Sequence, residues 1–273
     1  MITFPNAKIN LGLNIVSRRP DGYHNIETVF YPIPLTDSLE IVPAEGSEST
    51  LTCYGRVVDC PTEKNLVMKT YRMMEKEFGL PHVDIYLVKH IPDGAGLGGG
   101  SSDASFCMKM LNDMFKLGCT AEQLAKMASK IGADCPFFIH NKPMMATGIG
   151  DEFTPTDVCL KGKHMLLVKP DVSVPTKAAY AQVTPAPSAK PIPEILSDGM
   201  ENWQKELVND FEKSVFAQYP SLAEIKRTLL ESGASYAAMS GSGSSIFGIF
   251  SCAEMAEKAA DNFKEYSHFV IQL

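Results

Sequence analysis

The sequence has no run of basic residues, and its acidic residues outnumber its basic ones. It contains 32 Asp and Glu residues against 25 Lys and Arg residues, which gives a formal net charge of −7 at pH 7. Proteins that bind nucleic acids usually carry a basic face or tail that neutralises phosphates. We therefore expect no nucleic acid among the partners of this protein.

Long apolar segments and paired cysteines are also absent. The longest uncharged stretch, residues 233–253, contains too many Gly and Ser residues to span a membrane. The N-terminus lacks the basic and then apolar layout of a signal peptide. The seven cysteines include no CxxC pair and no histidine at zinc-finger spacing, which predicts reduced thiols in the core. These absences predict a cytoplasmic protein without membrane contact.

The chain has 273 residues, which is long for one compact core and sufficient for two. Apolar residues make up 45% of the sequence and charged residues 21%, both ordinary for a folded globular protein. We expect two modest domains with a cleft between them.

Residues 9–15 alternate between apolar and other side chains, which is the period of a half-buried strand. The opposite face of this strand carries Lys8, Asn10 and Asn14. For an arbitrary strand, such a polar face is solvated.

A core helix is predicted at residues 66–78, ended by Gly79, and a strand at residues 83–91. The apolar face of the helix consists of Val67, Tyr71, Met74 and Phe78. A glycine-rich loop follows the strand directly.

Two helices are expected after this loop, at residues 102–116 and 120–132. The second begins with a capping box formed by Thr120 and Gln123. Asp134 is therefore expected just past a helix end.

The C-terminal part alternates strands and helices, which favours an α+β layer of helices on an antiparallel sheet. Strands are predicted at residues 165–168, 236–239, 245–250 and 269–273, and helices at 201–216, 222–232 and 253–263. The proline-rich residues 185–193 are the best candidate for a linker or surface loop.

The loop between strand and helix contains five glycines within residues 92–102. Because glycine has no Cβ, its backbone amides can approach an anion closely. A helix expected to start at Ser101 or Ser102 adds unpaired amides and the positive end of its dipole. The predicted ATP-binding residues are Pro92, Asp93, Gly94, Ala95, Gly96, Leu97, Gly98, Gly99, Gly100, Ser101 and Ser102.

Two other nucleotide-binding patterns fit this loop less well. It satisfies GxGxxG through Gly94, Gly96 and Gly99, but the next periodic segment is a capped helix instead of the second strand of a dinucleotide fold. The Walker A pattern fails because Gly100 stands where lysine is required. A purely structural glycine turn is the remaining alternative.

Residues 92–102 resemble the phosphate loop of the GHMP kinases, the superfamily of galactokinase and of homoserine, mevalonate and phosphomevalonate kinases. Residues 5–11 are similar to the first motif of that superfamily, and residues 239–250 to its third. The resemblance implies an ATP-dependent small-molecule kinase of two domains. The first domain would be like ribosomal protein S5 domain 2 and the second ferredoxin-like, with the active site in the cleft. We assign them to residues 1–158 and 159–273.

Residues 18–24 and 132–138 resemble one branch of the superfamily more narrowly. This branch phosphorylates the 2-hydroxyl of a cytidine diphosphate-linked methylerythritol, in the non-mevalonate route to isoprenoid precursors. The resemblance implies that Asp134 is the general base that accepts the hydroxyl proton. It also implies that Lys8 keeps Asp134 ionised and stabilises charge on the transferring group.

The substrate site is likewise implied by resemblance. Tyr23 would stack on the cytosine, His24 would hydrogen-bond its edge, and Tyr180 would close its other side. Thr176 belongs to the same family stretch as Tyr180, and Asn10 is expected to bind oxygens of the substrate. Taken in isolation, Tyr23 and His24 would be a loop aromatic and a surface histidine.

The roles of Asp103 and of residues 240–245 stay open. Asp103 adds negative charge beside the phosphates, and it could cap the helix or meet Mg²⁺ through water. Residues 240–245 could offer amides to the diphosphate or form a tight hairpin. No cluster of acids marks a dedicated metal site, so Mg²⁺ is expected to arrive with ATP.

The sequence leaves two alternative functions open. The first is another GHMP kinase that acts on homoserine, mevalonate or a sugar, which the Tyr23 and His24 pair disfavours. The second is a non-catalytic ATP-binding regulator, which Lys8 and Asp134 disfavour.

Overall fold

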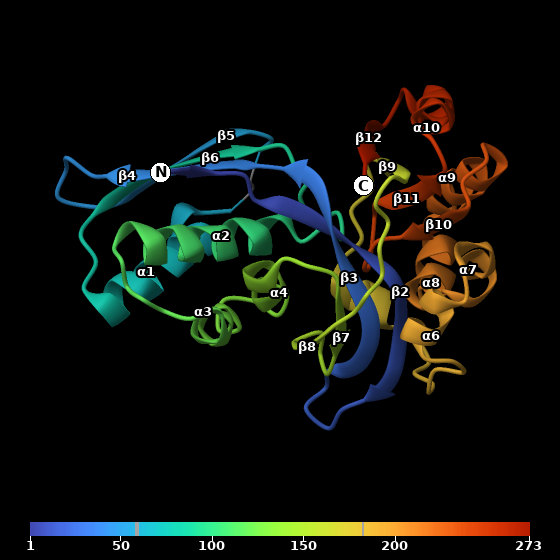
Figure 1. Cartoon of the computed structure of the whole chain (residues 1–273), viewed down its shortest axis with the longest axis horizontal. Coiled ribbons are helices and arrows are strands. Elements are labelled where there is room, and N and C mark those ends of the chain that lie inside the picture. Colours follow the sequence, from blue (N-terminus) through green and yellow to red (C-terminus); the bar gives the residue numbers. More distant parts are fainter. Residues whose placement is uncertain (58–59, 182) are drawn as a thin grey trace. The chain divides into compact units, whose positions relative to one another are not determined.

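The computed structural model describes residues 1–57, 60–181 and 183–273, and Figure 1 shows its helices and strands. The chain forms two compact units, each assembled from several segments. Unit 1 contains Met1–Ala7, Leu35–Asp93 and Gly98–Lys142, and unit 2 contains Lys8–Pro34, Gly94–Leu97 and Pro143–Leu273. The contiguous division at residues 158 and 159 stays a prediction.

Unit 1 is built on a four-stranded sheet of order β1-β4-β6-β5. Its strands are β1 (Ile2–Thr3), β4 (Ser38–Pro43), β5 (Thr50–Gly55) and β6 (Val83–Lys89). β4 and β6 are antiparallel, whereas β5 pairs with β6 in parallel. Every second residue of β6 is buried, as its alternation predicts.

The described residues of this unit form the helices α1 (Leu66–Phe78), α2 (Gly99–Met114), α3 (Ala121–Ala128) and α4 (Cys135–His140), with a 3₁₀ turn η1 (Thr62–Lys64) before α1. The predicted bounds of α1 are confirmed. The Asn65 side chain accepts from the Val67 N–H at its start, and Gly79 ends it at φ +66°. Phe78, however, is 36% exposed, so its assignment to the buried face is wrong.

The capping box of Thr120 and Gln123 is present in α3, and both of its hydrogen bonds form. α3 ends at Ala128, before the predicted Gly132. Its last predicted residues form turns in which the Gly132 N–H donates to the Ala128 carbonyl.

The second sheet has the order β2-β3-β7-β8, with β2 (Asn6–Arg18), β3 (His24–Thr36), β7 (Met144–Thr147) and β8 (Glu152–Pro155). From Ala7 to Ile15 every residue of β2 is buried. The polar face with Lys8, Asn10 and Asn14 is therefore not solvated, as such a face would be on an arbitrary strand. The chain covers this face because Leu207 and Ile192 pack against Gly12, and Ser188 hydrogen-bonds Asn14.

The third sheet is antiparallel throughout, with the order β10-β11-β9-β12. Its strands are β9 (His164–Lys169), β10 (Tyr236–Met239), β11 (Ile246–Phe250) and β12 (Ser267–Gln272). Buried side chains of this sheet share one core with α8 (Phe211–Gln218), α9 (Pro220–Glu231) and α10 (Ala253–Ala260), which a 3₁₀ turn η2 (Asp261–Phe263) follows. This arrangement confirms the predicted helical layer on an antiparallel sheet.

Unit 2 also contains α5 (Thr176–Ala181), α6 (Ile192–Ser197) and α7 (Met200–Glu206). The single helix predicted at residues 201–216 is wrong, because α7 and α8 are separated. The intervening residues run beside β2, where Asn209 forms a parallel bridge with Leu13. The proline-rich residues 185–193 are also tied to β2, because the Ala186 N–H donates to the Ile15 carbonyl.

Contrary to the prediction, not all of the cysteines lie in the core. Cys107 and Cys135 are buried, but Cys53, Cys60 and Cys159 are exposed. Among the described residues, none of the helices combines the length and apolar character needed to cross a bilayer.

Candidate functional site

The glycine-rich loop adopts a conformation that few other residues could take. Gly94, Gly96 and Gly98 have φ values of +57°, +74° and +70°. Gly98 is the N-cap of α2, so the helix begins at Gly99, before the predicted start at Ser101 or Ser102. The Ser102 N–H accordingly already donates to the Gly98 carbonyl, at 2.9 Å.

The start of α2 has the chemistry of an anion site. The N–H groups of a first helical turn have no acceptor within the helix, and the N-cap residue Gly98 has no side chain that could cap α2. The dipole of this 16-residue helix places positive charge at the same end. The backbone can therefore bind phosphate without a lysine of the Walker type.

Gly96 anchors the loop inside unit 2. Its carbonyl accepts from Lys8 Nζ at 3.1 Å and from Ser240 Oγ at 2.8 Å. A Cβ at this position would lie 2.0 Å from the Ser240 carbonyl oxygen. Glycine is needed here both for its positive φ and for this close backbone approach.

Lys8 and Asn10 come together on β2, as their shared strand face predicts. Lys8 is only 4% exposed, and its Nζ donates to Asn10 Oδ1 at 2.8 Å. Asn10 Nδ2 donates to Thr28 Oγ1 at 2.9 Å, and Thr28 donates to the Gly12 carbonyl. The Lys8 ammonium also lies 4.7 Å from the centre of the Phe30 ring. Lys8 is thus held in one direction by a chain of hydrogen bonds.

Residues 240–245 connect β10 to β11, so the hairpin interpretation of this segment is correct. The Ser240 N–H donates to the Ser245 carbonyl, which closes the turn. The loop also contacts a predicted substrate residue, because Thr176 Oγ1 lies 3.3 Å from Ser242 Oγ.

Asp134 occupies the N-cap position of α4, with φ −78° and no side-chain capping bond to that helix. The expectation that it follows a helix end is incomplete, because a short helix starts directly after it. Pro136 favours this helix start. Ser105 Oγ donates to the Cys135 carbonyl at 2.7 Å, which ties the start of α4 to α2.

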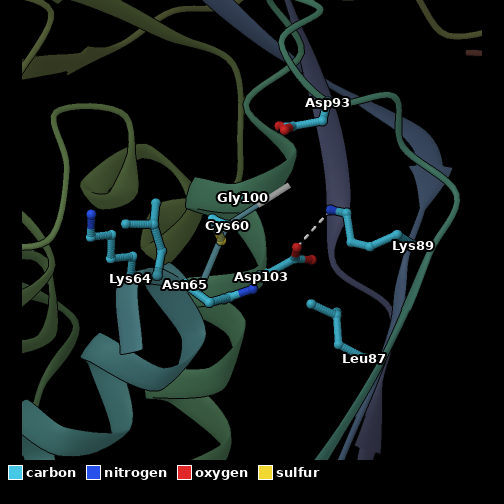
Figure 2. Close-up of a pocket in the computed structure, with 9 residues that line it drawn as sticks. Cys60, Lys64, Asn65, Leu87, Lys89, Asp93, Gly100 and Asp103 are labelled. Atoms are coloured by element: carbon cyan, nitrogen blue, oxygen red, sulfur yellow. Dashed lines mark hydrogen bonds and ion pairs between the residues drawn. The ribbon is translucent and has the colours of Figure 1, made fainter. Parts of the chain in front are cut away.

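A buried ion cluster lies beneath the start of α2. Lys89, on β6 and 5% exposed, is paired with Asp37 and Asp103. Figure 2 shows the pair of Lys89 with Asp103, whose atoms are 2.7 Å apart. Asp37 also accepts from the N–H groups of His90 and Ile91. Asp37 and Lys89 could not be predicted from the sequence, because residues 37, 89 and 103 share no local pattern.

The cluster shifts two pKa values. Burial raises the pKa of Asp103 to about 7, and the Asp37 charge adds to this, whereas Lys89 opposes it. Burial alone would lower the pKa of Lys89, but the charges of Asp103 and Asp37 raise it above its ordinary value. Asp103 lies inside α2, so a capping role is wrong. Its Oδ1 is buried without a hydrogen-bond partner in the described part of the chain.

A cavity of about 160 Å³ opens beside this cluster in unit 1. Figure 2 shows the lining side chains arranged around it. They are Cys60, Lys64, Asn65, Leu66, Leu87, Lys89, Asp93, Gly100 and Asp103. Apolar walls and polar groups thus lie next to the first turn of α2, which is the pattern of a small-molecule site.

The predicted cytosine-binding residues are partly assembled. The rings of His24 and Tyr180 are stacked, with centroids 4.8 Å apart and planes at 18°. Phe211 packs edge to face with Tyr180. Tyr23 is 62% exposed, and its backbone N–H donates to Asp21. The Tyr23 ring is therefore accessible to a planar partner.

Comparison with known families agrees with this geometry. The family model for the GHMP kinases N terminal domain matches residues 65–142, and that for the GHMP kinases C terminal matches residues 189–268. The first match includes the glycine loop and Asp134, and the second includes the hairpin loop at 240–245.

Individual relatives narrow the match. The chain is 55% identical over 260 residues to 4-diphosphocytidyl-2-C-methyl-D-erythritol kinase of Bacteroides fragilis, which covers 94% of this chain and 95% of that protein. It is 54% identical over 269 residues to the kinase of the same name from Parabacteroides distasonis, at 98% and 96% coverage.

A solved structure supports the fold over the same length. The crystal structure of a 4-(cytidine 5'-diphospho)-2C-methyl-D-erythritol kinase matches with a TM-score of 0.85 and 30% identity, and covers 99% of this chain and 98% of that one. These matches confirm the predicted GHMP kinase fold. Because the identity extends over nearly the full length of its relatives, the chain belongs to the 4-diphosphocytidyl-2-C-methyl-D-erythritol kinase family of GHMP kinases.

Proposed function

We propose that this protein transfers the terminal phosphoryl group of ATP to the 2-hydroxyl of 4-diphosphocytidyl-2-C-methyl-D-erythritol, a step of isoprenoid precursor synthesis. The observation that supports this most directly is the start of α2 behind the glycine loop, where the N-cap residue is Gly98. Phosphoryl transfer depends on positioning and charge neutralisation, which such a backbone site supplies. The relatives supply the identity of the acceptor.

ATP fits the residues of unit 1. The first-turn amides of α2 would hold the phosphates, and the neighbouring cavity would take the nucleoside. In the described ranges, no three His, Cys, Asp or Glu side chains are grouped to hold a metal ion. We therefore assign Mg²⁺ to the nucleotide itself, where it neutralises phosphate charge.

Lys8 is proposed as the cation that stabilises charge on the transferring group. Its hydrogen bonds to Asn10 and to the Gly96 carbonyl orient the ammonium before substrate binds. A preoriented charge needs little reorganisation during the reaction, which is the main source of electrostatic catalysis.

Asp134 is proposed as the general base that accepts the proton of the 2-hydroxyl. Its position before α4 is held by the hydrogen bond between Ser105 and Cys135. The proposal for the cytosine site involves Tyr23, His24 and Tyr180. His24 covers one face of Tyr180, so a base that stacks on that face requires the His24 ring to leave it.

Replacing Asp134 by Asn tests the proposed base. We expect ATP binding to persist and turnover to fall roughly 10²- to 10⁴-fold, the usual contribution of general base catalysis. Asp113→Asn, the same change at an exposed position of α2, is the matched control and should keep full turnover. Unchanged turnover in Asp134→Asn would refute the role of this carboxylate.

A panel of alcohol acceptors tests the substrate. Phosphorylation by the purified protein is measured with the cytidyl substrate, homoserine, mevalonate and a sugar. The proposal predicts turnover chiefly with the cytidyl substrate. Equal or faster turnover of another alcohol would assign a different kinase activity, and ATP binding without any transfer would favour a regulator.

A further inference from the structure

The segment Asn209, Asp210, Phe211 and Glu212 runs from the connection after α7 into the first turn of α8, and it contacts two other parts of unit 2. Asp210 Oδ2 accepts from the Ile15 N–H of β2 at 2.7 Å. Glu212 Oε1 accepts from the Met239 N–H of β10 at 2.8 Å. The segment therefore connects β2, which carries Lys8, to the end of β10, where the 240–245 loop begins.

Asn209 makes the central contacts of this segment. It is 4% exposed, and its Nδ2 donates to the carbonyls of Met239 and Gly241, both at 2.8 Å. Its Oδ1 accepts from the Phe211 N–H at 3.0 Å. Both hydrogens of the amide are thus used on the two carbonyls that flank Ser240. An aspartate of the same shape has no hydrogens to donate when ionised.

The backbone of Asn209 is itself anchored to β2. The Leu13 N–H donates to the Val208 carbonyl, and the Asp210 N–H donates to the Leu13 carbonyl, each at 2.8 Å. The backbone on either side of Asn209 is therefore bonded to β2, and the Asn209 side chain is bonded to the 240–245 loop and to Met239 before it.

The 240–245 loop in turn contacts Gly96. Ser240 Oγ donates to the Gly96 carbonyl, which is also an acceptor of the Lys8 ammonium. A Cβ on Gly241 would lie 3.4 Å from Asn10 Oδ1, so the same loop packs close to the other acceptor of Lys8. The two acceptors that orient Lys8 thus lie against the loop whose carbonyls Asn209 holds.

We propose that Asn209 is a positioning residue for phosphoryl transfer, which holds the 240–245 loop so that Ser240 fixes the Gly96 carbonyl and, through it, the Lys8 ammonium. This inference rests on the proposed catalytic role of Lys8. Asn209 acts through other groups and does not itself bind the nucleotide or the alcohol.

The test compares Asn209→Asp with Asp210→Ala in the full-length protein. Asn209→Asp removes the two donors while keeping the shape, and Asp210→Ala loosens the same segment without a contact to the 240–245 loop. We expect Asn209→Asp to lower kcat roughly 10- to 100-fold, because small misplacements of catalytic groups have effects of this size. KM for the cytidyl substrate should stay within about twofold of the wild-type value, since no substrate contact is removed. Asp210→Ala should lower kcat less than about threefold.

A double-mutant cycle then tests whether Asn209 acts through Ser240. Ser240→Ala removes the hydroxyl that joins the loop to Gly96. Combined with Asn209→Asp, it should add little further loss of kcat, because both changes break one path. Combined with Asp210→Ala, the two effects should multiply. Thermal unfolding midpoints of all variants show how much each change destabilises the fold.

Three outcomes overturn the inference: a kcat loss in Asn209→Asp no larger than in Asp210→Ala at equal thermal stability, a rise in KM that accounts for the loss, or effects of Asn209→Asp and Ser240→Ala that multiply. If Asn209→Asp does not fold, Asn209→Ala is measured in the same way and judged by the same criteria. Activity retained in Lys8→Met would instead refute the proposed function of Lys8, a result that the Asn209 variants cannot produce.

Discussion

Among the described residues, two buried lysines differ in the hydrogen-bond partners that the structure gives them. Lys8, in unit 2, is 4% exposed and donates to the amide oxygen of Asn10 and to the Gly96 carbonyl. Lys89, in unit 1, is 5% exposed and is paired with the carboxylates of Asp37 and Asp103. Equal burial therefore accompanies different hydrogen-bond partners.

Neutral oxygens and carboxylates have different effects on a buried ammonium group. An amide or carbonyl oxygen directs an ammonium group without cancelling its charge, so such bonds suit a lysine that acts on a phosphoryl group. Asp37 and Asp103 surround the charge of Lys89 inside the fold, and removal of one group from such a cluster leaves the others buried without that partner. We expect substitutions of Lys8 to affect mainly catalysis and those of Lys89 mainly stability.

The largest expected effect is that of Lys8→Met on turnover. Cations that stabilise a transferring phosphoryl group contribute roughly 10³- to 10⁵-fold, so we expect kcat to fall about 10⁴-fold, or about 5 kcal/mol. Steady-state assays with ATP and the cytidyl substrate measure this. Turnover within tenfold of the wild-type value would contradict the catalytic role of Lys8.

The next effect is that of Lys89→Met on stability. Breaking a buried ion pair typically costs about 3 to 5 kcal/mol, because an uncompensated charge stays behind. Urea unfolding of Lys89→Met and Lys8→Met, with the wild type in parallel, should show the larger loss of unfolding free energy in Lys89→Met. Equal losses in the two variants would contradict the larger expected contribution of the Lys89 ion cluster to stability.

The smallest effect, over the range from pH 5 to 8, is the pH dependence contributed by Asp103. Its pKa is raised from 3.8 to about 7 by burial, so the folded state retains this proton at pH values where the unfolded state has lost it. Stability from this group is therefore lost as pH rises between about 4 and 7, with a limiting slope of about 1.4 kcal/mol per pH unit.

Asp103→Asn should remove this slope while keeping an oxygen for Lys89. Unfolding free energies measured from pH 5 to 8 should fall with pH in the wild type relative to the variant. Asp113→Asn, at an exposed position of the same helix, serves as the reference and should run parallel to the wild type. If Asp103→Asn also runs parallel, then Asp103 does not titrate in this range.

Local chemistry explains which elements were predictable. The bounds of α1 follow from a side-chain cap at Asn65 and a left-handed glycine at its end, both within a few residues of the helix. The phosphate loop was predictable for the same reason, because its glycines and the following helix are consecutive in the chain. The start of α2 was misplaced because glycine can continue a helix as well as precede it.

Contacts between distant segments explain what was missed. The polar face of β2 looks solvated in isolation, but Leu207, Ile192 and Ser188 come from far along the chain to cover it. Asn209 lay in a segment predicted as helix, and nothing in its neighbours indicated that its amide binds Met239 and Gly241.

The amino-acid sequence by itself determined the backbone chemistry of phosphate binding and, through its motifs, the family of the protein. Both depend on residues that are adjacent in the chain, so their meaning survives without a fold. Only the tertiary structure decided how each buried lysine is paired, because the partners of Lys8 include Gly96 and those of Lys89 include Asp37 and Asp103. The packing of strands and helices selects such partners, and the pattern of a single segment carries no information about them.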